Sequence, residues 1–240
     1  MIMLASEGYA IVNINYELAP KAKYPAQLIQ IGEAYEFIEN SDLYPFIDKD
    51  IIYFGGDSAG AHIAAQFIIV QTNPDYVSLL NHIKETKDIK KVVHKNITGA
   101  ILFAGPYDFN ELSHLVKSRV NNKDDSVVNS IISFIAKRIG QAYLNTLEWK
   151  NNEKFNVLSI VDYVDSNFPK TFITDGRKIS FEEHAKELGN SLIQKGVWIT
   201  SIYHDYDLMH EYQFNLGTVS DDNNNYALIT FNYLLDFLND

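Results

Sequence analysis

The chain has 240 residues, of which 46% are hydrophobic, so it is long enough to bury a full core as one domain. Its net charge of -11 at pH 7 gives phosphate backbones and anionic lipid surfaces nothing general to bind, which argues against a nucleic-acid partner. There is no cysteine, which excludes disulfides, thiolate metal sites and cysteine nucleophiles and fits a reducing compartment.

The N-terminal stretch has no basic segment, and its apolar run is interrupted by Ser6, Glu7, Asn13 and Asn15. These features argue against a signal peptide or a membrane span, so we expect a cytoplasmic protein with no membrane partner. Within this stretch, GYAIVNINY predicts a first strand at residues 8–16.

Beyond this strand, apolar runs with strand character alternate with segments of helical spacing, a pattern typical of a mostly parallel sheet with helices on both faces. A helix with one apolar face is predicted to begin at Pro25. DIIYFGGDSAG (50–60) predicts a strand followed by a tight turn, and the alanine-rich segment at 59–71 predicts a buried helix. ITGAILFAGPYDF (97–109) predicts another strand.

Residues 110–165 break this alternation, because they form a longer, more polar and more helical stretch. We interpret them as an insertion rather than a unit of the sheet. The alternation then resumes with a predicted strand at 170–176, a helix at 181–196, a strand at 197–204 and a terminal helix near 225–238.

The motif GDSAG places Ser58 between Gly56 and Gly60, after a predicted strand and before a predicted helix. A nucleophile elbow requires this context, because the serine must occupy a sharp, strained turn that neighbouring backbone can approach closely. The flanking strand and helix favour a nucleophile over an incidental serine in a glycine-rich turn. The Ala59 N–H would point at a developing oxyanion, and Asp57 is expected to form a contact beneath the turn.

A serine nucleophile needs a base, which comes late in the chain in hydrolases of this topology. His210, in DLMHEYQF after the last long predicted strand, is our candidate, and His204 is its nearest rival. His62 is expected to have a structural role. The four remaining histidines lie in polar or amphipathic segments and are expected at the surface: His82, His94, His114 and His184.

Three segments, YELAP at 16–20, the GDSAG elbow and MHEYQF at 209–214, together resemble the α/β-hydrolase carboxylesterases of the hormone-sensitive-lipase-like group. The order and spacing of these segments match from residue 8 onward. The resemblance implies a three-layer α/β/α sandwich, in one domain covering residues 1–240, with the 110–165 insertion as a helical cap.

The same resemblance implies a serine hydrolase that cleaves small carboxylic esters through an acyl-enzyme. Ser58 would be the nucleophile, His210 the general base and Ala59 one backbone donor of the oxyanion hole. No metal or organic cofactor is implied, and the expected partner is a small ester.

Relatives in this group carry an HGGG-type loop upstream of the YELAP segment, and this sequence has no counterpart of it. Loss of one oxyanion donor costs roughly 100- to 1000-fold in turnover. The missing strands would also leave an open sheet edge. A fragment, a shortened reading frame and a homo-oligomer that covers the edge all remain open explanations.

The acid of the family triad is also displaced. Where relatives have an aspartate, residues 177–180 read RKIS, and none of these side chains orients an imidazole as a carboxylate would. Asp175 at the end of the strand is our preferred candidate, and Glu182 at the start of the next helix is the alternative. Together, these departures support a second hypothesis: a catalytically impaired or truncated esterase that acts as a binding module.

Overall fold

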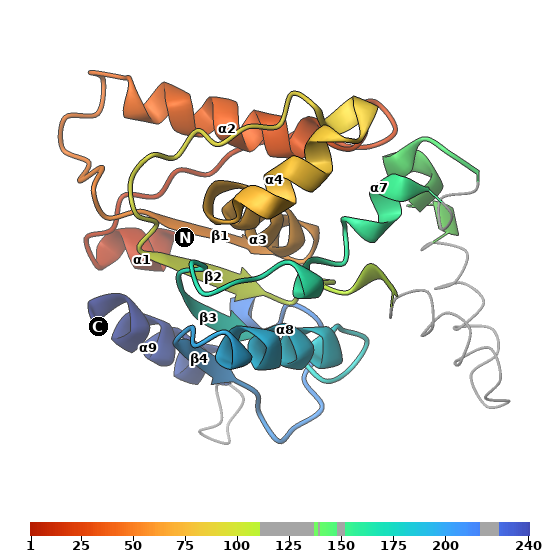
Figure 1. Cartoon of the computed structure of the whole chain (residues 1–240). Helices are drawn as coiled ribbons and strands as arrows, with labels where there is room; N and C mark the ends of the chain where they lie inside the picture. The colour runs from red at the N-terminus through yellow and green to blue at the C-terminus, as the bar shows by residue number, and fades with distance from the viewer. Residues whose placement is uncertain (111–136, 139, 148–151, 217–225) are drawn as a thin grey trace, which may run out of the picture.

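The computed structural model describes the chain except for residues 111–136, 139, 148–151 and 217–225 (Figure 1). Within the described residues, four parallel strands form one sheet whose order follows the chain. The strands are β1 (Tyr53–Asp57), β2 (Gly99–Phe103), β3 (Lys170–Thr174) and β4 (Ile199–Ile202). Because they all run in one direction, their carboxyl ends meet at one edge, where parallel sheets usually carry their sites.

Helices occupy most of the connections between these strands. The longer ones are α2 (Ala26–Glu39), α3 (Ala59–Thr72), α4 (Pro74–Asn81), α8 (Glu182–Gln194) and α9 (Tyr226–Asn239). The shorter ones are α1 (Ile2–Ser6), α7 (Glu153–Asn156) and the 3₁₀ helices η1 (Lys84–Thr86), η5 (Ile160–Asp162) and η6 (Tyr212–Phe214). None of the helices in the described residues has the length and apolar character that a membrane span needs.

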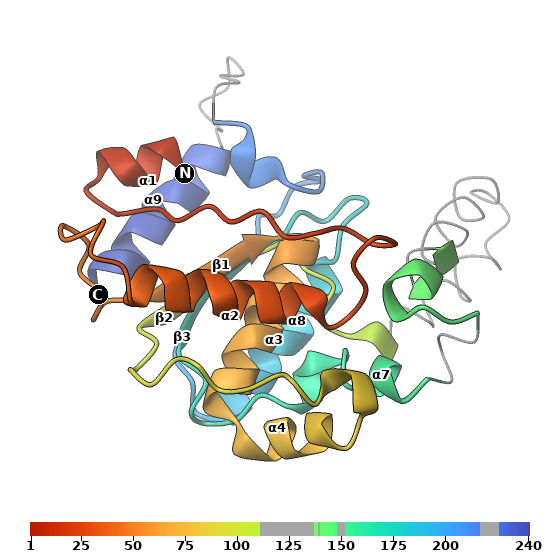
Figure 2. The same ribbon diagram turned by 90° about the horizontal axis from the view of Figure 1, so that it is seen from above.

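The helices form layers on both faces of the sheet. On one face, α3 packs on β1 and β2, and α8 packs on β3 and β4. Helix α2 lies on the outer side of α3. Helices α9 and α1 lie on the opposite face, as Figure 2 shows from above. This arrangement confirms the predicted three-layer α/β/α sandwich.

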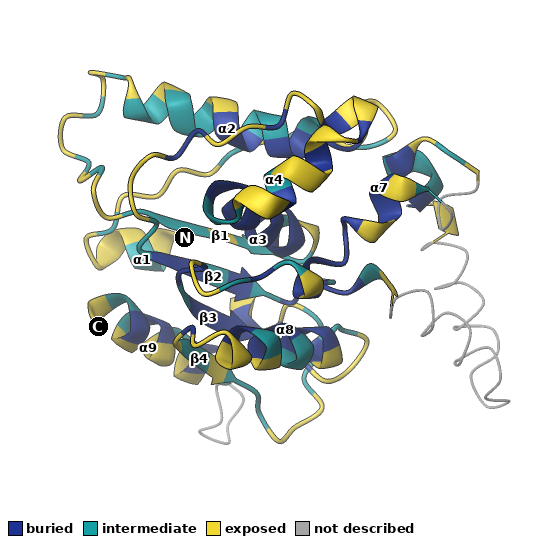
Figure 3. Cartoon of the chain, viewed as in Figure 1, coloured by how far each residue is buried: buried dark blue, intermediate teal, exposed yellow. Residues whose placement is uncertain are grey.

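The main core lies between the sheet and α3 and α8, and α3 is its centre. Every residue of α3 from Ala61 to Gln71 is buried (Figure 3), which confirms the predicted buried helix. Most positions around α3 are apolar, so the helix is stable only inside the protein. A smaller core, built around Phe172, Leu234 and Phe237, lies between the sheet and α9.

The strand predicted at residues 8–16 is wrong. This segment runs beside the sheet from α1 to α2 without regular secondary structure (Figure 2), and β1 pairs only with β2 in the described part of the chain. Ile14 and Tyr16 pack against the main core, while most of their neighbours are exposed. The alternation of apolar residues therefore reflects an extended segment with one side packed on the core. The segment is not a strand, because it lacks the hydrogen-bond ladder to a neighbouring strand.

The strand predicted at 97–109 is shorter than expected, because the chain turns at Ala104, whose φ is 51°. Of the predicted insertion at 110–165, the described parts include α7 and η5. Most of the rest lies outside the described residues, and its function as a cap stays a prediction.

Candidate active site

Ser58 lies in the turn between β1 and α3. Its φ of 53° and ψ of -118° are values that residues with a side chain rarely adopt. The Ser58 N–H donates a hydrogen bond to the Phe103 carbonyl at 2.8 Å, which ties the turn to the end of β2. Backbone strain of this kind persists only where the surroundings hold it, and it clusters at functional sites. The local structure is the strand–turn–helix that a nucleophile elbow requires.

The two glycines of GDSAG differ in their packing. A Cβ added to Gly56 would lie 2.3 Å from the backbone carbon and oxygen of Gly60. A Cβ added to Gly60 would meet nothing within 4 Å. The close approach expected from the motif is therefore real at Gly56, whereas Gly60 has room for a side chain.

We expect Gly56→Ala to lower the free energy of unfolding by about 3 kcal/mol, because backbone atoms must move apart to admit the methyl group. Gly60→Ala is the matched control, and it should raise that free energy by roughly 0.5 kcal/mol, since alanine favours the helix. Urea unfolding followed by circular dichroism measures both changes. Equal destabilisation by the two variants would show that the close contact does not decide stability.

His210 lies in the loop between β4 and η6, and its imidazole reaches the predicted nucleophile. The distance from His210 Nε2 to Ser58 Oγ is 3.1 Å, although the two residues are 152 positions apart in the chain. Burial lowers the pKa of His210 below its ordinary value, so the neutral imidazole predominates at pH 7. A neutral ring with a free lone pair on Nε2 can accept a serine proton, as a general base must.

Asp175 follows directly after β3 and is almost fully buried. Its carboxylate accepts hydrogen bonds from the N–H groups of Gly176 at 2.7 Å and Phe181 at 3.1 Å, and from the hydroxyl of Ser180. Burial raises the pKa of Asp175 to about 7, against the opposing effect of these bonds. The carboxylate does not bond to His210 directly.

Ser180 stands between Asp175 and His210, so one residue of 177–180 does contact the imidazole, through a hydroxyl rather than a carboxylate. Its Oγ lies 2.7 Å from His210 Nδ1 and also bonds to the Asp175 carboxylate. The alternative acid, Glu182, is buried and pairs with Lys186 at 2.6 Å and with Arg177 at 3.7 Å. No ion pair joins Glu182 to His210 in the described residues.

The loop after β3 and the loop that carries His210 are joined through their backbones. The Lys178 N–H donates to the Leu208 carbonyl at 2.8 Å, and Lys178 forms a bridge with Met209. Gly176 permits this approach, because a Cβ there would lie 2.3 Å from the Met209 carbonyl oxygen. These contacts bring Ser180 to the imidazole. No local pattern in the sequence predicts them.

Ala59 begins α3, so its N–H belongs to the first turn, whose donors have no acceptor within the helix. It lies beside Ser58 and near the positive end of the helix dipole. The structure thus places Ala59 where an oxyanion donor is expected.

Asp57 contacts the segment after His210, beside the elbow rather than within its turn. Its Oδ1 accepts a hydrogen bond from Gln213 Nε2 at 2.8 Å. Burial, followed by the neighbouring Glu211 carboxylate, raises the pKa of Asp57 to about 7. Glu211 itself has a φ of 62° and places an oxygen 3.9 Å from His210 Nε2, a contact that sequence reasoning missed.

Among the other histidines, His82 and His94 are exposed, as expected, and His114 lies outside the described residues. His62 is buried and donates from Nε2 to the Leu158 carbonyl at 2.9 Å, as its expected structural role requires. His204 Nε2 lies 2.8 Å from Thr230 Oγ1. The surface position expected for His184 is wrong: it is buried, and its Nδ1 accepts from the Asp108 N–H at 3.2 Å.

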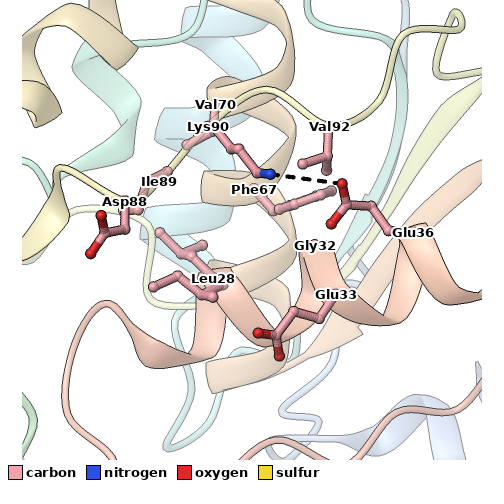
Figure 4. Close-up of a pocket in the computed structure, with 11 residues that line it drawn as sticks. Leu28, Gly32, Glu33, Glu36, Phe67, Val70, Asp88, Ile89, Lys90 and Val92 are labelled. Atoms are coloured by element: carbon pink, nitrogen blue, oxygen red, sulfur yellow. Dashed lines mark ion pairs between the residues drawn. The ribbon is translucent and has the colours of Figure 1, made fainter.

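A pocket of about 160 Å³ lies away from these residues, between α2, α3 and the loop at 88–92 (Figure 4). Lys90 and Glu36 form an ion pair across it at 3.9 Å. None of the predicted site residues lines this pocket. In the described part of the chain, no cluster of three or more histidine or acidic side chains is arranged to hold a metal ion.

Comparisons with known proteins bear on the family and the fold. The family model BD-FAE matches residues 1–192. Esterase LipQ from Mycobacterium tuberculosis is 24% identical over 178 residues, which are 74% of this chain and 36% of LipQ. The chain therefore spans about a third of the length of this curated relative.

Solved structures of esterases share the fold. Esterase B from Lactobacillus rhamnosis superposes with a TM-score of 0.68 at 18% identity, over 99% of this chain and 67% of that chain. A structure of esterase B inhibited with a C4-C4 tributyrin phosphonate has a TM-score of 0.67 at 17% identity, over 99% of this chain and 67% of that chain. Carboxyl esterase 2 from Tuber melanosporum has a TM-score of 0.63 at 18% identity, over 96% and 69% of the two chains.

The family match covers well over half of the chain, and the structural likeness extends over nearly all of it. Both agree with the resemblance carried by YELAP, GDSAG and MHEYQF. The chain belongs to the BD-FAE family and has the α/β-hydrolase fold.

Proposed function

We propose that this chain is a serine hydrolase that cleaves small carboxylic esters through an acyl-enzyme. The observation that carries the proposal is the 3.1 Å distance between Ser58 Oγ and His210 Nε2, at a strained turn between a strand and a helix. A serine hydroxyl is a weak nucleophile until a neighbouring base removes its proton. Ser58 and His210 lie within hydrogen-bond reach of each other, which supports these two roles.

In the first half of the reaction, Ser58 Oγ attacks the ester carbonyl while His210 Nε2 takes the hydroxyl proton. The Ala59 N–H donates to the oxyanion of the tetrahedral intermediate. The intermediate collapses when His210 returns its proton to the leaving alcohol, which leaves the acyl group on Ser58. Water then repeats the sequence, so that one ester and one water yield one acid and one alcohol.

The relatives support the class of substrate. LipQ and the solved structures described above are named esterases, and one esterase B structure holds a tributyrin phosphonate. We infer that this chain acts on short acyl esters. Asp175 acts as the acid of the site in this proposal, with its charge next to the loop that carries His210.

A fluorophosphonate probe tests the proposal, because it phosphonylates only an activated serine. We expect the folded protein to be labelled at Ser58, as identified by peptide mass spectrometry. Heat-unfolded protein and the Ser58→Ala variant should both remain unlabelled. Folded wild-type protein that resists the probe would overturn the proposal and favour a binding module with an inherited site.

A further inference from the structure

A continuous chain of side chains leads from the buried carboxylate to the nucleophile. Ser180 Oγ bonds to Asp175 at one end and lies 2.7 Å from His210 Nδ1 at the other. His210 Nε2 then lies 3.1 Å from Ser58 Oγ. In this chain of contacts, a hydroxyl occupies the position in which a carboxylate contacts the imidazole of a Ser-His-Asp triad.

Above the pKa of Asp175, where its carboxylate is ionised, one assignment of protons satisfies every contact. If His210 Nε2 accepts from Ser58, the proton of the neutral ring is on Nδ1, which donates to Ser180 Oγ. The single hydroxyl proton of Ser180 is then donated to Asp175, whose carboxylate only accepts. The hydroxyl therefore accepts from the imidazole and donates to the carboxylate, so the carboxylate charge polarises it toward the ring.

The backbone around Ser180 is held in an unusual conformation. Ile179, the preceding residue, has a φ of 53°, which is a genuine outlier for a β-branched side chain. Such strain costs on the order of 1–3 kcal/mol and persists only when the surroundings impose it. The surroundings here are the Lys178–Met209 bridge on one side and the Phe181 N–H bond to Asp175 on the other. They fix the direction of the Ser180 side chain.

We propose that Ser180 is a positioning residue that couples Asp175 to His210 through its hydroxyl, in place of a direct carboxylate–imidazole contact. This inference rests on the proposed function, because it assigns a role within the same site. Ser180 holds the imidazole in the tautomer that accepts from Ser58, and it stabilises the imidazolium that forms when the proton is transferred.

The charged groups around His210 determine how the pKa of its imidazole changes in the variants. Glu211 faces Nε2 from the same loop at 3.9 Å, while Asp175 acts from the end of β3 through Ser180. Asp57, at the end of β1, interacts with Glu211. Removal of the Ser180 hydroxyl takes away the acceptor on Nδ1 and leaves the Glu211 contact in place, so the imidazolium becomes less stable and the pKa of His210 falls.

The main experiment compares Ser180→Ala, Asp175→Asn and the double variant in p-nitrophenyl butyrate hydrolysis across pH. We expect Ser180→Ala to lower kcat by about 10- to 100-fold with little change in KM, because the contact matters most in the transition state. The acid limb of the rate profile should move down by roughly half a pH unit to one unit. Ser180→Thr, which keeps the hydroxyl, should restore most of the rate.

The double variant distinguishes a relay from two separate effects. If both residues act through one chain of contacts, the double variant loses about as much kcat as the more damaging single variant. If they act independently, their losses multiply, and that result would overturn the inference. Ser191→Ala, in the last part of α8, is the matched control and should leave both kcat and the pH profile unchanged.

A measurement that needs no activity separates this inference from the proposed function. Nitrogen-15 NMR of the His210 ring reports its tautomer and its pKa in wild-type protein and in Ser180→Ala. We expect an Nδ1–H tautomer in the wild type and a lower pKa in the variant. An active wild type whose Ser180→Ala variant has the same kcat, tautomer and pKa would refute the role of Ser180 alone, whereas failure of fluorophosphonate labelling would refute the proposed function.

Discussion

Ser58→Ala is expected to abolish ester hydrolysis, with a loss in kcat on the order of a million-fold, and to leave the fold intact. Removal of the nucleophile in well-studied serine hydrolases costs about this much, and the residual rate reflects binding and the oxyanion donors. The fold should survive because alanine keeps the backbone of the elbow, in which the Ser58 N–H bonds to the Phe103 carbonyl. The initial rate of p-nitrophenyl butyrate hydrolysis measures the loss.

Ser58→Gly provides a control that separates chemistry from backbone strain. Glycine adopts the observed φ of 53° and ψ of -118° without steric penalty, so this variant should be inactive yet about 1 kcal/mol more stable than Ser58→Ala. Thermal unfolding compares the two. A Ser58→Ala variant that keeps more than about one hundredth of the wild-type rate would show that Ser58 is not the nucleophile.

His210→Ala is expected to lower kcat by a similar factor, because the nucleophile and the base of one site fail together. Without the imidazole, the Ser58 hydroxyl keeps its proton and the leaving alcohol has no acid. Fluorophosphonate labelling of Ser58 should therefore slow in parallel with ester hydrolysis. The Ser58→Ala/His210→Ala double variant should be no less active than either single variant, because the two residues act as a unit.

His204→Ala is the matched control, because both histidines follow β4. His204 bonds to Thr230 at 2.8 Å and contacts the Tyr212 and Tyr226 rings, so its loss should lower the melting temperature. Its kcat should stay within about threefold of wild type, since a change of this size is under 1 kcal/mol in the barrier. A large loss of kcat in His204→Ala, with His210→Ala still active, would exchange the roles assigned to the two residues.

The parts of the site that lie next to each other in the chain were predictable from the sequence. The GDSAG motif with its flanking strand and helix predicted the turn at Ser58, because the residues that impose this turn are local. His210 was predictable from its place after the last strand, since topology fixes where the late loops of a parallel sheet emerge. The structure brings this histidine to Ser58.

The orientation of the acid was not predictable, because contacts distant in the chain determine it. Ser180 reaches His210 only because Gly176 and Lys178 lie against the backbone of Leu208 and Met209. A sequence pattern shows which residues follow the strand but not which way that loop folds. The sequence therefore does not reveal that the Ser180 side chain contacts the imidazole.

Two predictions failed for the same physical reason. One concerned the burial of a polar side chain, and the other concerned the pairing of a strand. His184 lies on a helix that looks amphipathic, yet packing against the loop at Asp108 buries it. The segment at 8–16 has the alternation of a strand but no partner strand in the described residues. In both cases the outcome depends on a neighbour that periodicity cannot reveal.

The strands lie in the sheet in the same order as in the chain, so each strand made during translation adds to the side of the one before it. Ser58 directly follows the first strand, and His210, whose imidazole lies 3.1 Å from it, comes 152 residues later. At roughly 5–20 residues per second, a ribosome needs about 8 to 30 s to synthesise that interval. A growing chain therefore presents Ser58 long before His210, and the contact between the two side chains can form only after residue 210 has been added.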